Sequence, residues 1–80
     1  MVHVRLFAGL RDLAKRGDLD VPWREGLTVG QVRAELVRRL PSLAPLLDRS
    51  RAAVGDDLAA NEVMVPDEAE VAFLPPVSGG

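Results

Sequence analysis

The chain has 80 residues, of which 48% are hydrophobic and 28% are charged, and its formal net charge is -2. This length and composition predict one globular domain with a single small core. The slight acidic excess argues against nucleic acid as a partner, because binding along a phosphate backbone needs a clear basic excess. The absence of cysteine excludes disulfides, thiolate metal sites and a cysteine nucleophile.

No apolar run approaches the length that spans a membrane, so we expect no membrane association. The N-terminal stretch "MVHVRLFAG" lacks the charged start and long apolar segment of a signal peptide. These features together predict a cytoplasmic protein.

The N-terminal segment has the two-residue period of a strand with one buried face. Its apolar side chains alternate with His3 and Arg5, and those that face the core are Val2, Val4 and Leu6. The same parity turns Phe7 to the opposite face of the sheet. His3 is then expected to be a solvated strand residue, because the chain has no second histidine to share a metal ion.

A short helix and a second strand are predicted next. Apolar residues at helical spacing between 10 and 14 indicate the helix, and Gly17 is its expected C-terminal cap. The stretch "DLDVP" at 18–22 alternates acidic and apolar residues and stops at a proline, which is typical of an edge strand. Trp23 comes next and is expected to cover one end of the core.

The clearest local signal is "LTVGQV", which predicts the start of the main helix. Thr28 and Gln31 have the spacing of a capping box, and Leu27 and Val32 have that of a hydrophobic staple. The helix should begin at Thr28 and cannot continue through Pro41. Its predicted apolar stripe consists of Val29, Val32, Leu36, Val37 and Leu40. Its predicted outer face carries Arg33, Glu35, Arg38 and Arg39.

The last third of the chain predicts a connector and three strands. Residues 41–49 contain two prolines and indicate a packed connector with one helical turn. Gly55 lies between two short apolar runs at 51–60, as in a hairpin. The final strand, "EVAFLP" at 70–75, is apolar on both faces, which favours a central place in the sheet.

This order of elements predicts an α+β fold in which one main helix packs across a mixed sheet. The first and last strands are the most apolar, and both are buried if they lie side by side, parallel and joined through the helix. The resulting architecture is the β-grasp, or ubiquitin-like, fold. Residues 1–75 are expected to form this domain, and residues 76–80 a projecting tail.

The residues offer little internal chemistry. No combination of nucleophile, base and oxyanion donors is recognisable. Asp67, Glu68 and Glu70 cluster before the last strand, where a solvated turn is a better explanation than an acid-base pair. Phe7 and Leu74 lie on the sheet face beside the tail, where they form either a partner-binding apolar patch or a surface covered by loops.

The tail "PPVSGG" is the remaining candidate. Its prolines fix φ and lack N–H donors, so they end the sheet ladder and project the last four residues away from the sheet. Its glycines lack Cβ atoms, so the last peptide can pass through a narrow channel. The Gly80 carboxylate is then the candidate reactive group, and another protein must activate it, for example as an acyl adenylate. The residues expected to thread are Pro75, Pro76, Val77, Ser78 and Gly79.

Three stretches of the sequence carry a family resemblance: "VRLFAGLRDLA", "LTVGQVRAEL" and "VAFLPPVSGG". Over essentially its full length the chain resembles the small subunits of molybdopterin synthase, which are ubiquitin-like sulfur carriers. The last stretch is the most specific, because it joins the final strand, the proline pair and the glycine pair in one register.

The resemblance implies a mechanism and a set of partners. An adenylyltransferase related to ubiquitin-activating enzymes would use ATP to adenylylate Gly80, and a sulfur donor protein would supply the thiocarboxylate. The tail would enter the large subunit of molybdopterin synthase and donate sulfur to cyclic pyranopterin monophosphate. The carrier itself would be no enzyme and would bind neither cofactor nor metal. Phe7 and Leu74 fall where the family has apolar partner contacts.

The chain departs from the family at two places and leaves other functions open. Many relatives have Asp-Gly-Asp where this chain has Asp67, Glu68 and Ala69, and many have phenylalanine in place of Leu74. Alternative functions are a sulfur carrier for thiamine thiazole or tRNA thiolation, and a ubiquitin-like modifier that joins Gly80 to lysine. A further alternative is an interaction domain in which the glycine pair is incidental.

Overall fold

The computed structural model describes residues 1–76. Val77, Ser78, Gly79 and Gly80 lie outside the described residues, so their predicted roles stay predictions. The same holds for the boundary between the domain and the tail.

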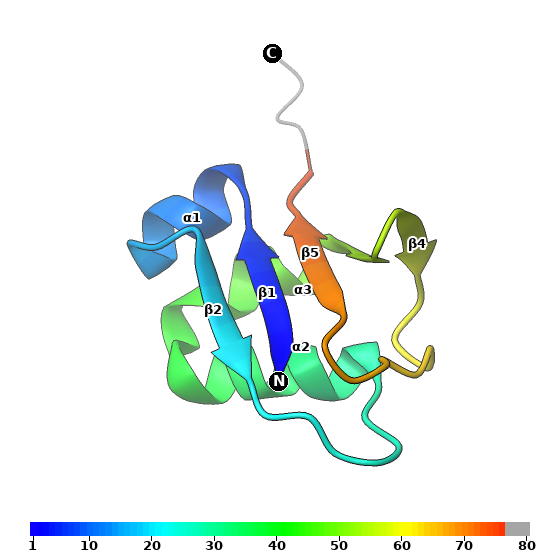
Figure 1. The fold of residues 1–80 in the computed structure, drawn as a ribbon. Coiled ribbons are helices and arrows are strands. Elements are labelled where there is room, and N and C mark those ends of the chain that lie inside the picture. The colour runs from blue at the N-terminus through cyan, green and yellow to red at the C-terminus, as the bar shows by residue number, and fades with distance from the viewer. Residues whose placement is uncertain (77–80) are drawn as a thin grey trace.

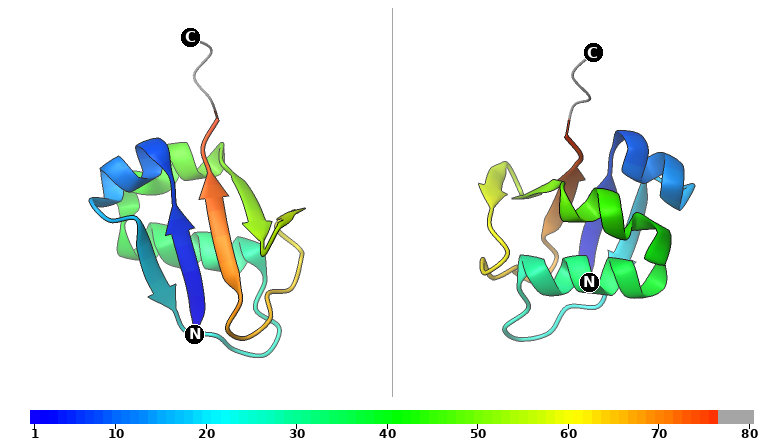
Figure 2. Two further views of the ribbon diagram at one scale, coloured as in Figure 1. Left: turned by 45° about the horizontal axis from the view of Figure 1, so that its top comes forward. Right: turned by 180° about the vertical axis from the view of Figure 1, so that it is seen from behind.

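One mixed sheet carries helices on one of its faces (Figures 1 and 2). Its five strands lie in the order β2-β1-β5-β3-β4, with β1 and β5 parallel and every other pair antiparallel. The predicted mixed sheet with a central last strand is therefore confirmed. In chain order the elements are β1 (Val2–Leu6), α1 (Ala8–Ala14), β2 (Asp18–Val21), α2 (Val29–Arg39), the 3-10 helix η1 (Pro41–Leu43), α3 (Ala44–Asp48), β3 (Arg51–Val54), β4 (Asp57–Ala59) and β5 (Glu70–Leu74).

The core forms between the helices and the inner face of the β1 and β5 pair. Val4 lies opposite Val71 and Leu6 opposite Phe73, and all four side chains are buried. The alternating pattern of β1 therefore has the predicted parity, with Val2 also buried. Burying such side chains supplies most of the stabilising free energy of a domain this small.

The capping box predicted for the main helix is present. The Thr28 hydroxyl accepts from the Gln31 amide at 3.3 Å, and the Thr28 amide donates to the Gln31 side chain at 3.0 Å. The next two amides, of Val29 and Gly30, donate to carbonyls in the loop 61–63 at 3.0 and 2.9 Å. Amides that a helix start leaves without partners are thus satisfied both locally and by a distant loop.

The stripe of α2 is buried as predicted, but one of its outer residues is not where the pattern places it. Val29, Val32 and Leu36 are fully buried, while Val37 and Leu40 pack against the core at its margin. Arg33 was expected to point outward, and its side chain instead turns toward the C-terminal end of α3 and the residues just after it.

The Arg33 guanidinium joins three parts of the fold. It donates to the carbonyls of Leu47 and Ser50 and to the side chain of Asn61, and its carbon lies 5.1 Å from the centre of the Phe73 ring. Burial lowers the pKa of this group from its ordinary value. Carbonyl partners at the end of a helix, together with an aromatic face, explain why a charged side chain is stable there.

Two local expectations are wrong. Gly17 does not cap α1: Lys15 takes the left-handed conformation, with φ of 60°. Gly17 instead lies outside the helix, where its carbonyl accepts from the Leu6 amide at 2.9 Å beside the β1 and β2 ladder. The segment 41–49 is also more helical than one turn, since it forms both η1 and α3.

Trp23 covers the end of the core as expected. Its ring is partly buried against the core cluster, and its indole N–H donates to the Val65 carbonyl at 2.7 Å. Within residues 1–76 the longest helix has 11 residues, and none has the length and apolar character needed to cross a bilayer.

Leu36→Ala should lower the free energy of unfolding by about 2 to 5 kcal/mol, because this side chain is fully buried and its removal leaves a cavity. Urea unfolding measures the change. Leu13→Ala is the matched control, since Leu13 is 46% exposed and its loss should cost little. Equal effects of the two substitutions would contradict the placement of α2 over the sheet.

Candidate functional site

The candidate site is the end of the sheet where β5 stops. The ladder ends at Leu74, directly before Pro75 and Pro76, as the missing N–H donors of two prolines predict. Leu74 is 38% exposed, Pro75 is half-buried and Pro76 is exposed. The last described residues therefore leave the sheet from the carboxyl end of a central strand (Figure 1).

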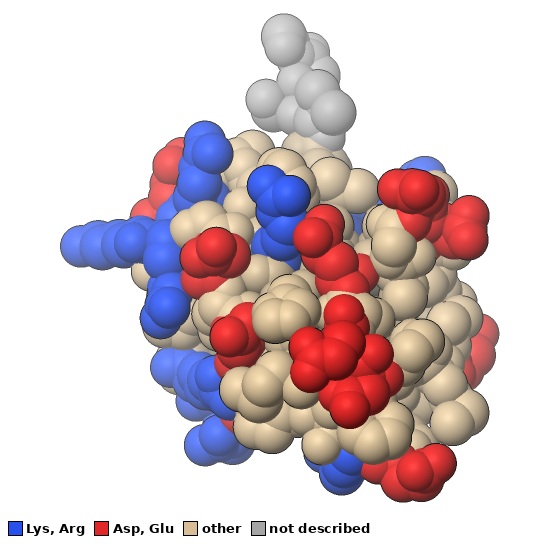
Figure 3. Space-filling model, in the orientation of Figure 1, with Lys and Arg blue, Asp and Glu red and all other residues tan. Residues whose placement is uncertain are grey.

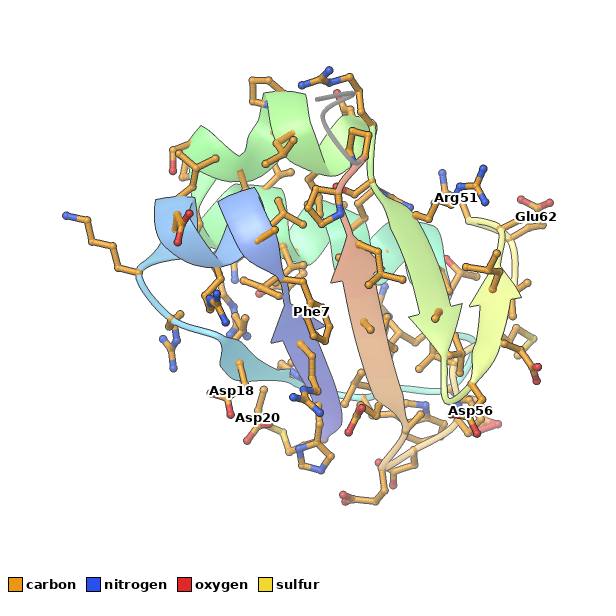
Figure 4. All side chains as sticks on the ribbon, turned by 90° about the horizontal axis from the view of Figure 1, so that it is seen from above. Phe7, Asp18, Asp20, Arg51, Asp56 and Glu62 are labelled. Carbon is orange, nitrogen blue, oxygen red and sulfur yellow. The ribbon has the colours of Figure 1, made fainter. Side chains whose placement is uncertain are left out.

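Phe7 lies beside this exit, as the sequence predicted. Its backbone is extended, with φ of -120° and ψ of 156°, so the alternation of β1 continues through it to the outer face. Because Leu6 pairs with Phe73, Phe7 and Leu74 occupy the next positions on adjacent parallel strands. Figure 4 looks down on this end of the sheet and shows Phe7 next to β5.

Phe7 keeps part of its surface accessible. It is half-buried, and the Arg5 guanidinium lies 5.5 Å from the centre of its ring. Arg5 also approaches Glu70 to 3.7 Å, so the cation lies between the ring and the next strand. The structure thus brings Phe7 and Leu74 together on one accessible face, with a cation at its edge.

A third apolar residue on this face was missed by the sequence reasoning. Strand register places Arg5, Ala72, Ala53 and Leu58 in one row across β1, β5, β3 and β4. Leu58 is 61% exposed at the end of that row. The alternation of side chains in the predicted hairpin could have revealed Leu58, because it places this residue opposite Ala53 on the outer face of β3.

The opposite end of the same face is acidic and contains the N-terminus (Figure 3). The Met1 amine donates to Asp67 at 3.1 Å and to Glu68 at 3.4 Å. His3 lies between Asp20, 2.8 Å from its Nδ1, and Glu68, 3.2 Å from its Nε2. The predicted solvated turn is confirmed, and its carboxylates bind the first strand rather than one another.

These contacts shift two pKa values in the same direction. The hydrogen bond to Asp20, and then that to Glu68, raises the pKa of His3 above its ordinary value of 6.5. The hydrogen bond to Asp67 is the largest cause of a raised pKa at the Met1 amine. Both groups are exposed, so solvent screens their contribution to stability.

The turn at residues 67–69, which lacks the glycine found in many relatives, is nevertheless formed. Glu68 has φ of 64°, a conformation that glycine adopts at lower cost. Its amide donates to the Met1 carbonyl at 3.1 Å, and its carboxylate contacts the Met1 amine and the His3 ring. The glutamate therefore adds contacts to β1 that glycine lacks.

Chemical groups suited to metal binding do not converge in the part of the chain that is described. No group of three or more histidine, aspartate or glutamate side chains within residues 1–76 could hold a metal ion. Phe7, Leu74, Pro75 and Pro76 are the predicted site residues that the structure brings together.

Comparison with known proteins identifies the family. The ThiS family model matches residues 4–80, nearly the whole chain. The chain belongs to the ThiS family. A curated relative in this comparison, the molybdopterin synthase sulfur carrier subunit of Arabidopsis thaliana, is 32% identical over 99% of this chain and 82% of its own length. The resemblance to molybdopterin synthase small subunits is thereby confirmed.

Solved structures confirm the β-grasp fold. SAMP1 from Haloferax volcanii superposes with a TM-score of 0.88 at 28% identity, covering 99% of this chain and 98% of its own. Subunits 1 and 2 of the molybdopterin-converting factor from Helicobacter pylori form a protein complex, one chain of which matches with a TM-score of 0.71 at 25% identity. That match covers 99% of this chain and 97% of the other.

NMR titration should give His3 a pKa above 6.5 that falls toward this value in Asp20→Asn, because Asp20 is the main cause of the shift. Asp18→Asn is the matched control, since Asp18 lies on the same strand opposite Arg5 and does not contact His3. A His3 pKa that is equally changed by both substitutions would contradict this assignment.

The same shift gives stability a pH dependence of known sign. A folded-state pKa above the unfolded one stabilises the fold fully below about pH 6.5, and this contribution is lost as pH rises through the folded value. The difference in urea midpoint between the wild type and His3→Gln should therefore shrink from pH 5 toward pH 8.5.

Proposed function

We propose that this protein is the sulfur carrier subunit of a molybdopterin synthase and that the Gly80 carboxylate carries the sulfur. The observation that supports it most is the 32% identity to a curated carrier subunit over 99% of the chain. The family match also extends to residue 80 and so includes the "PPVSGG" stretch.

The proposed chemistry belongs to the carboxyl group and to partner proteins. A carboxylate oxygen of Gly80 attacks the α-phosphorus of ATP in an adenylyltransferase related to ubiquitin-activating enzymes, and pyrophosphate leaves. Hydrosulfide delivered by a sulfur donor protein then attacks the acyl carbon and displaces AMP, and loss of its proton leaves a thiocarboxylate. ATP is a substrate of the activating enzyme, and the carrier needs no bound cofactor.

The proposed acceptor complex contains the large subunit of molybdopterin synthase, in which the thiocarboxylate donates sulfur to cyclic pyranopterin monophosphate. A relative from Helicobacter pylori is solved as a complex of its two subunits. In this chain the outer face that carries Phe7, Leu58 and Leu74 suits such a contact, because accessible apolar side chains lie on the sheet face beside the exit of the tail.

Incubation with the cognate activating enzyme, ATP and a sulfur donor should shift the intact mass of the protein by the exchange of one oxygen for sulfur. The mass before reaction establishes that Gly80 carries the free carboxyl group. Deletion of Gly80 should abolish the shift and leave the melting temperature nearly unchanged, because a tail contributes few contacts. An unshifted wild-type mass with a competent enzyme would reject the proposal.

Phe7→Ala and Leu74→Ala should each weaken binding to the large subunit by about tenfold, the effect of losing roughly 1.4 kcal/mol at an interface anchor. Isothermal titration calorimetry measures the affinity. Met64→Ala is the control, since Met64 is 62% exposed and pairs with Thr28 away from the tail. Affinities that match this control would show that the partner uses a different face.

A second function, protein modification, is favoured by the likeness to SAMP1, a small archaeal modifier protein of Haloferax volcanii. In that role an amine of lysine, rather than sulfur, would displace AMP from the Gly80 adenylate. Gly-Gly remnants on lysines of cellular proteins would support it. Rescue of strains lacking carriers for molybdopterin, thiamine thiazole or tRNA thiolation would separate the sulfur pathways.

A further inference from the structure

A groove of about 460 Å³ borders the base of the tail, on the side of β5 away from Phe7. Its lining residues are Arg49, Arg51, Leu74, Pro75 and Pro76. Register fixes this arrangement, because β3 begins opposite the residue at which β5 ends. Figure 4 shows Arg51 and Phe7 on opposite sides of β5.

Both arginines of the groove are exposed cations. Within residues 1–76 neither has a carboxylate within ion-pair distance. Arg38 and Arg39, by contrast, hold Glu35 so tightly that its pKa falls to about 2. The groove is therefore locally basic, although the whole chain has a net charge of -2.

Asp48 is next to Arg49 in the chain, and Glu62 lines a neighbouring hollow together with Arg51 (Figure 4), but neither carboxylate is within ion-pair distance of these arginines. The main acidic cluster lies elsewhere on the sheet. Asp20, Asp67 and Glu68 gather around Met1 and His3, at the end of β1 opposite the tail. The molecule thus has a cationic pair at the exit of the tail and a carboxylate cluster at its other end. A partner that approaches the tail meets the cations first.

We infer that this groove docks carboxylates on the rim of the tail channel in the activating enzyme, an inference that rests on the proposed function. Charged rims accelerate encounter and select partners, and screened contacts of this kind release quickly. Those properties suit an enzyme that must free the carrier after each adenylylation. The apolar face around Phe7 suits the stoichiometric synthase complex instead.

The groove is expected to contact the rim of the channel rather than the ATP bound by the enzyme. Four extended residues after Pro76 span at most about 14 Å, so a threaded tail carries its carboxyl group deep into the enzyme. The arginines remain at the mouth of the channel with the groove that they line. There they attract aspartate or glutamate side chains through their charge.

ATP–pyrophosphate exchange by the cognate activating enzyme tests the inference. Arg49→Glu and Arg51→Glu should each lower kcat/KM about threefold to tenfold through a higher KM, with kcat retained, because a rim charge affects encounter. The difference in kcat/KM between the wild type and these two variants should shrink as the salt concentration rises toward about 0.5 M. Arg51→Lys should restore most of the lost kcat/KM, since it keeps the charge.

Arg24→Glu is the matched control. It makes the same change of charge, and Arg24 lies just beyond the end of β2 that pairs with Val2, far from the tail. Urea unfolding of each variant should coincide with that of the wild type, which excludes loss of structure. This control should leave the exchange kinetics within about twofold of wild type.

Two outcomes overturn the inference alone. In one, the activating enzyme exchanges pyrophosphate equally well with Arg24→Glu, Arg49→Glu and Arg51→Glu as carrier. In the other, Arg49→Glu and Arg51→Glu lose affinity for the large synthase subunit while exchange is unaffected. Absence of exchange even with the wild type would instead overturn the proposed function and the inference together, so the two failures are distinguishable.

Discussion

Two strands from opposite ends of the chain, β1 and β5, lie parallel in the middle of the sheet, and every other element is placed relative to them. Parallel neighbours cannot be joined by a tight turn, so the chain between them must cross over one face of the sheet. That crossover contains α2, whose buried stripe closes the core. β2 and β3 then extend the sheet by pairing with the outer edges of this central pair.

The same pairing sets the polarity of the surface. Its register places Phe7 and Leu74 together at the end of the sheet from which the chain leaves toward the tail. It also places Met1 and His3 at the other end, where the turn before β5 supplies their carboxylate partners. The residues proposed to meet a partner and those that anchor the N-terminus are therefore separated by the length of one strand.

Local periodicity was sufficient to predict most of this architecture. The alternation in β1 and the capping box at Thr28 each depend on neighbouring residues alone, and both are present. The errors depend on distant contacts. Lys15 rather than Gly17 ends α1, and the Gly17 carbonyl is hydrogen-bonded to β1. Arg33 turns inward because α3 and Phe73 provide its partners, which no helical pattern could reveal.

The position of the single tryptophan makes folding and partner binding separable by spectroscopy. Trp23 is the dominant fluorophore of a chain without tyrosine, and its indole is hydrogen-bonded to Val65 near the beginning of α2. Loss of the fold would release this indole to solvent and change its emission. Occupation of the distant tail exit would leave its surroundings intact, so intrinsic fluorescence would report the state of the core independently of whether a partner holds the carrier.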